Sequence, residues 1–145
     1  MKTLDSINHW GETHQSIWFD LIRIILGVFL LVKGLLFTVD FDRFHTILLN
    51  SQFAFIEAGL VHYVIFSHIV GGLFIALGLK TRIAVLINLP ILLGAVIFIN
   101  AKHGFFTGDS ELGISIAILI LLIFFLFYGS GKYSIDRYMD THTFY

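Results

Sequence analysis

The sequence predicts an all-α integral membrane protein: a four-helix bundle of antiparallel spans with both termini cytoplasmic. Of the 145 residues, 57% are hydrophobic and 13% charged, whereas soluble domains carry about 25% charged residues. The apolar residues form runs of about 20, enough to cross the ~30 Å hydrocarbon core of a bilayer. Loops rich in Lys and Arg tend to stay in the cytoplasm. With four spans, the side of the membrane that holds both termini carries five basic residues, Lys2, Lys80, Arg82, Lys132 and Arg137, and the other side carries two, Arg43 and Lys102. This difference favours cytoplasmic termini.

The composition also narrows the chemistry. The chain has no cysteine, which excludes disulfides, thiolate metal sites and covalently attached haem. Its formal net charge is −1 and it contains no basic block, so we expect no nucleic-acid partner. The histidines show neither HxxxH nor HExxH spacing, so we expect no metal site.

We expect one membrane domain over residues 1–145. The polar leader resembles no cleavable signal peptide, so the first span, about 17–38, is expected to remain in the protein. The mixed segment that follows predicts a short surface or re-entrant helix at 42–50, with Asp42 as its N-cap.

The second and third spans are expected at about 57–79 and 82–101. The turn between them is so short that the two helices must form a hairpin. Gly78 is a suitable helix terminator and Thr81 a suitable N-cap for the next helix. Pro90 predicts a kink in the third span.

The fourth span is expected at about 111–128. Asp109 or Ser110 is the expected N-cap of its helix. A polar, amphipathic tail follows at 132–145.

Charged residues in the first span need partners, because an unpaired charge is costly in lipid. Asp20 and Arg23 are three residues apart and share a helix face with Gly27 and Gly34. The glycines allow a neighbouring helix to approach, so we expect a structural ion pair inside the bundle, although a ligand role for Arg23 stays open. Lys33 lies off this face, where it either extends toward the headgroups or contacts a ligand.

The other spans carry candidates for a ligand site or a proton path. His68 lies near the middle of its span, where an ionisable group tends to mark such a path, although a hydrogen-bonded packing role is the alternative. Asn88 is either a candidate or a polar link between helices. The expected depth in the membrane and the helix faces place these side chains in one polar layer with Lys33, Glu57 and Glu111. We expect no catalytic residue.

Several motifs together resemble the DoxX family of small four-helix bacterial membrane proteins. The glycine-rich hairpin and the ending at 129–137 are the most specific of them. One departure concerns the position before the Gly-Gly pair, which is often Glu in the family and is His68 here. The motifs are Arg23-x3-Gly27, Lys33-Gly34, His68-Ile-Val-Gly71-Gly72, Gly78-Leu-Lys-Thr81-Arg82 and Gly129-Ser-Gly131-Lys-Tyr-Ser134-Ile-Asp136-Arg137.

The resemblance implies a protein of the bacterial cytoplasmic (inner) membrane, related to the small subunit of a thiosulfate:quinone oxidoreductase. We therefore expect an accessory or quinone-interacting subunit, with a protein partner or a homo-oligomer and without a redox centre of its own. It is not expected to be a stand-alone enzyme or to bind a cofactor covalently. Two alternatives stay open: a bundle that binds or transports a small solute, lipid or proton, and a purely structural subunit.

Overall fold

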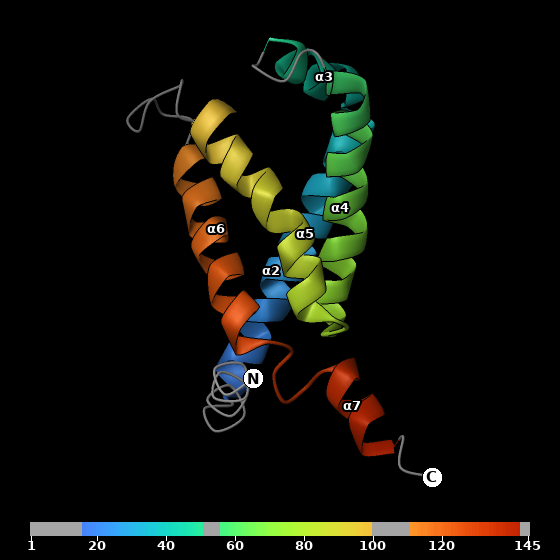
Figure 1. Cartoon of the computed structure of the whole chain (residues 1–145), viewed down its shortest axis with the longest axis vertical. Coiled ribbons are helices and arrows are strands. Elements are labelled where there is room, and N and C mark those ends of the chain that lie inside the picture. Colours follow the sequence, from blue (N-terminus) through green and yellow to red (C-terminus); the bar gives the residue numbers. More distant parts are fainter. Residues whose placement is uncertain (1–15, 51–55, 100–110, 143–145) are drawn as a thin grey trace.

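The computed structural model describes residues 16–50, 56–99 and 111–142, apart from the side chains of residues 57, 58, 99, 111, 140 and 142. All regular structure in these ranges is helical (Figure 1). The all-α prediction is confirmed for this part of the chain. The elements are α2 (Ile17–Val39), α3 (Phe41–Leu49), α4 (Glu57–Leu77), α5 (Thr81–Gly94), the π-helix η2 (Ala95–Ile99), α6 (Glu111–Tyr128) and α7 (Ile135–His142).

In the described part of the chain, three stretches of helix are long and apolar enough to cross a membrane: Ile17–Val39, Gly59–Leu77 and Thr81–Phe98. The apolar helix Leu112–Tyr128 is shorter. Many large apolar side chains on these helices point outward, such as Ile25 at 60% exposed and Leu86 at 60%. Such surfaces are stable only against lipid or another apolar partner, so the helices belong in a membrane.

Helices α2 and α4 pack closely against each other, and glycines line their contact. A Cβ added at Gly27 would lie 2.6 Å from the backbone oxygen of Gly72, and one at Gly34 would lie 2.9 Å from Cβ of His68. The predicted close approach of a helix at Gly27 and Gly34 is therefore confirmed. Gly34 of α2 thus lies beside His68 of α4.

The turn between α4 and α5 begins as predicted, since α4 ends at Gly78 in the left-handed conformation (φ 68°). The two N-cap predictions are wrong. Thr81 is the first residue of α5, and Lys80 is its N-cap. Likewise Asp40 is the N-cap of α3, so Asp42 falls inside the first turn of that helix. The predicted caps Asp109 and Ser110 lie outside the described residues.

Helix α5 leans away from α4 and toward α6 along its second half (Figure 1). Pro90 lies inside α5, and the π-helix η2 follows at Ala95. Proline removes a helical hydrogen bond and a π-helix shifts the register of the next turn, so both re-aim the helix. Helix α3 packs on α4, where Phe44 and Leu48 form a small core with Val61 and Val64.

Candidate ligand-binding site

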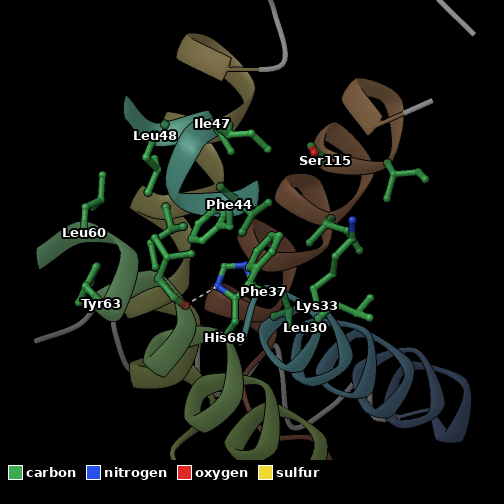
Figure 2. A pocket seen from close by; sticks show the side chains of 18 of the residues that line it. Leu30, Lys33, Phe37, Phe44, Ile47, Leu48, Leu60, Tyr63, His68 and Ser115 are labelled. Carbon is green, nitrogen blue, oxygen red and sulfur yellow. Dashed lines mark hydrogen bonds between the residues drawn. The ribbon is translucent and has the colours of Figure 1, made fainter. Parts of the chain in front are cut away.

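A cavity of about 470 Å³ occupies the space beneath α3 (Figure 2). Ligand sites in proteins commonly have volumes of about 300–1,000 Å³. The wall is mostly apolar, with a few polar side chains set into it. Residues from five helices and η2 line the cavity, including Phe29, Leu30, Lys33, Phe37, Asp40, Arg43, Phe44, Leu48, Tyr63, Val64, His68, Pro90, Gly94, Ala95, Ser115 and Ile118.

His68 is the buried polar residue of this wall, with 5% of its surface exposed. Its Nδ1 donates a hydrogen bond to the backbone carbonyl of Val64, one helical turn earlier, at 3.0 Å (Figure 2). This bond orients the ring and leaves Nε2 as the nitrogen available to a ligand. His68 therefore offers one polar atom of defined direction in apolar surroundings.

Aromatic rings form the wall beside His68. Phe37 of α2 stacks on Phe44 of α3, with ring centroids 4.2 Å apart and planes 9° apart. The Phe37 centroid also lies 5.8 Å from that of the His68 ring, at a tilt of 59°. Aromatic walls favour flat ring-shaped ligands, because offset or edge-on ring contacts add to the energy of apolar burial.

Lys33 enters the same cavity from α2, four residues before Phe37. Figure 2 shows Lys33 and His68 approaching the cavity from two helices, with Phe37 between them. Asp40 and Arg43 line the part of the cavity near α3. The cavity thus combines an apolar body with one imidazole and a small number of charged groups.

The bend in α5 makes room for this cavity, since Pro90, Gly94 and Ala95 all line it. The hydroxyl of Tyr63, also in the wall, donates to the backbone carbonyl of Ile87 at 3.2 Å and so links α4 to α5 beside the bend. Small residues and a proline on the lining helix leave volume that larger side chains would fill.

The predicted layer is brought together only in part. Lys33 and His68 share the cavity, whereas Asn88 does not line it. The Asn88 amide is fully buried and donates to the carbonyls of Ser67 (3.1 Å) and Ala84 (2.9 Å), linking α4 to α5. The side chains of Glu57 and Glu111 lie outside the described residues.

Asp20 and Arg23 form a buried ion pair at the other end of the bundle, with Nη1 and Oδ1 3.2 Å apart. Both also bind the backbone that follows α6. Arg23 Nη2 donates to the carbonyl of Tyr133 at 2.7 Å, and the Tyr133 N–H donates to Asp20 Oδ2 at 3.1 Å. These bonds give both charged groups partners inside the protein, while the buried Arg23 Nε has no hydrogen-bond partner.

Asp136 also anchors the segment that follows α6. Its carboxylate accepts the Lys80 N–H at 2.8 and 3.0 Å and the Ser130 hydroxyl at 2.6 Å, while its own N–H donates to the Gly78 carbonyl at 3.2 Å. Asp136 thus binds the N–H of Lys80, which is the N-cap residue of α5. We call residues 129–137, bound by Asp20, Arg23 and the α4–α5 turn, the C-terminal clamp.

Sequence reasoning missed the aromatic wall and the partners of the clamp. Phe37 could have been noticed, because it lies on the same helix face as Lys33, four residues away. Nothing in the sequence points to Phe44 as its stacking partner, since α3 is placed only by the fold. Within the described residues, no three His, Asp or Glu side chains are grouped as metal ligands, and the absence of a metal stays a prediction.

The family model for DoxX matches residues 19–101, more than half of the chain. The chain belongs to the DoxX family. The matched part runs from α2 to η2 and contains Lys33, Phe37, His68 and Pro90, so it supplies most of the cavity wall. It ends before α6 and the C-terminal clamp. Neither the curated proteins nor the solved structures contain a significant match to this DoxX protein.

Proposed function

We propose that this DoxX protein is a quinone-interacting or accessory subunit of a membrane oxidoreductase, without a redox centre of its own. In this proposal α6 is the fourth span of an antiparallel bundle in the bacterial inner membrane, with both termini cytoplasmic. The observation that carries the proposal is the apolar cavity in which His68 stands beside stacked Phe37 and Phe44.

The residues of the cavity fit a quinone ring. Phe37 and Phe44 provide aromatic surface for a flat ring, and His68 and Lys33 provide polar contacts for ring oxygens. A bound quinone would supply two-electron redox chemistry. The chain has no cysteine, and the proposal places the electron donor or acceptor on a partner protein.

The mostly apolar wall of the cavity favours a lipophilic ligand over a hydrated one. A path for a small polar solute needs polar groups along its length to replace hydration, whereas polar side chains are few in this cavity. Transport of a solute or proton is the less supported function for that reason. Lys33 and Arg43 could still serve an amphiphile with a charged end.

The test is ligand binding by the purified full-length protein in lipid nanodiscs. A short-chain ubiquinone or menaquinone analogue is titrated in its oxidised and in its reduced form, without oxygen, and binding is followed by calorimetry. We expect binding by the wild type and at least a tenfold weaker affinity of His68→Ala for the reduced form, equivalent to about 1.4 kcal/mol. The matched control is His62→Ala, because His62 is on the same helix and does not line the cavity.

Absence of binding by the wild type would reject the quinone-interacting role. Equal affinities of wild type and His68→Ala would reject His68 as the contact. The accessory role is tested separately by co-purification from mild detergent, followed by identification of bound proteins and lipids. Recovery of an oxidoreductase subunit supports it, whereas recovery of the chain alone, in every mild detergent tried, contradicts it.

A further inference from the structure

We infer that His68 makes the cavity selective for a ligand hydroxyl over a ligand carbonyl, so that the preferred ligand is the reduced, hydroquinone form of the ring or a phenol of similar size. This inference rests on the proposed function and refines its ligand. It follows from the direction of one hydrogen bond and the chemistry of the two nitrogens of one imidazole.

The bond to Val64 determines which nitrogen of His68 carries the proton. A backbone carbonyl can only accept a hydrogen bond, so Nδ1, 3.0 Å from the Val64 oxygen, must be the donor. In the neutral imidazole, the second nitrogen then has a lone pair and no hydrogen. His68 Nε2 therefore presents an acceptor to a ligand in the cavity.

An acceptor at this position distinguishes two oxidation states of the same ring. A hydroquinone O–H donates to Nε2. A quinone carbonyl has only lone pairs, so the two acceptors face each other and both lose their hydrogen bonds to water on binding. In a mostly apolar wall few other donors can compensate for that loss.

Lys33 does not reverse this preference. An ammonium group donates and never accepts, so it can bind the oxygen of a hydroxyl or a carbonyl. A hydroquinone oxygen can both donate and accept, and thus satisfies either side chain of the cavity. Of these two side chains, a quinone oxygen can accept a hydrogen bond from Lys33 but not from His68 Nε2.

The experiment compares three ligands of the same ring: tetramethylhydroquinone, tetramethylbenzoquinone and tetramethylhydroquinone dimethyl ether. Full-length protein in nanodiscs is titrated without oxygen near pH 8, above the ordinary imidazole pKa of about 6.5. We expect the hydroquinone to bind about tenfold more tightly than the other two. The dimethyl ether keeps two ring oxygens but lacks the O–H, so it separates hydrogen-bond donation from redox state.

Equal affinity for the hydroquinone and the quinone, or tighter binding of the quinone or the ether, would overturn the inference and leave the proposed function standing. Binding of none of the three, nor of any longer quinone, would overturn the quinone-interacting role on which the inference rests. The variant His68→Gln presents both an N–H and a carbonyl, so we expect the tenfold preference to fall to about twofold or less. His62→Gln should retain the full preference, and its loss there would contradict the role of His68.

Discussion

Arg23 and Tyr133 are 110 positions apart in the chain, and Arg23 Nη2 donates to the Tyr133 backbone carbonyl at 2.7 Å. Together with Asp20 this bond ties the segment after α6 to the first turns of α2. Ion pairs inside a span usually suggest a ligand or an ion path. Here the pair holds the protein's own backbone, and the cavity beneath α3 contains a separate set of polar groups.

Removing one member of the ion pair should destabilise the protein strongly. Asp20→Asn leaves the Arg23 charge buried at 1% exposure, and breaking a buried pair from one side costs roughly 3–5 kcal/mol. The double variant Asp20→Leu/Arg23→Met should lose less than the sum of its single variants. Unfolding followed by circular dichroism in detergent measures this, and additive losses would contradict the pairing.

Gly131 is expected to tolerate no side chain. Its φ is +74°, and an added Cβ would meet Asp20 Oδ1, so Gly131→Ala combines backbone strain with displacement of the ion pair. We expect a loss of about 2 kcal/mol or more. Gly113→Ala is the matched control, because an added Cβ there meets nothing within 4 Å. An equal effect of the two substitutions on melting temperature would refute this explanation.

Asp136 is expected to hold the C-terminal clamp on the α4–α5 turn. Asp136→Ala removes three accepted hydrogen bonds, which should cost roughly 1–3 kcal/mol because the donors lose a charged partner. Amide hydrogen exchange should rise in residues 129–137 and at Lys80, and stay unchanged in α3. Asp42→Ala is the control, because Asp42 is an exposed residue of α3. Unchanged exchange at Lys80 would argue against the clamp.

Asn88 should contribute to stability and not to ligand binding. Its amide links Ser67 and Ala84 between α4 and α5, outside the cavity. Asn88→Ala is expected to lower stability by about 1–2 kcal/mol while quinone-analogue affinity changes by less than about twofold. A correctly folded Asn88→Ala protein that has lost binding would return Asn88 to the candidate site.

From the sequence, only those site residues could be predicted that stand out by their helix face and by their depth in the membrane. His68 and Lys33 stand out because ionisable groups are rare in apolar runs and their depths are similar. The bonds of the clamp could not be predicted, because they join positions 20 and 23 to 133, and 80 to 136. Such pairings depend on how the helix ends are placed.

By itself the sequence determined the helices, their apolar surfaces and the glycine face of α2 that a neighbouring helix can approach, because all of these follow from local periodicity and residue size. Only the tertiary structure decided what the polar residues bind. It placed α3 over the bend of α5, set Phe37 and Phe44 beside His68, and directed Asp20, Arg23 and Asp136 to backbone groups of distant segments. The physical reason is that hydrogen bonds and ring contacts act over a few ångströms, and three-dimensional packing alone brings such distant residues within that range.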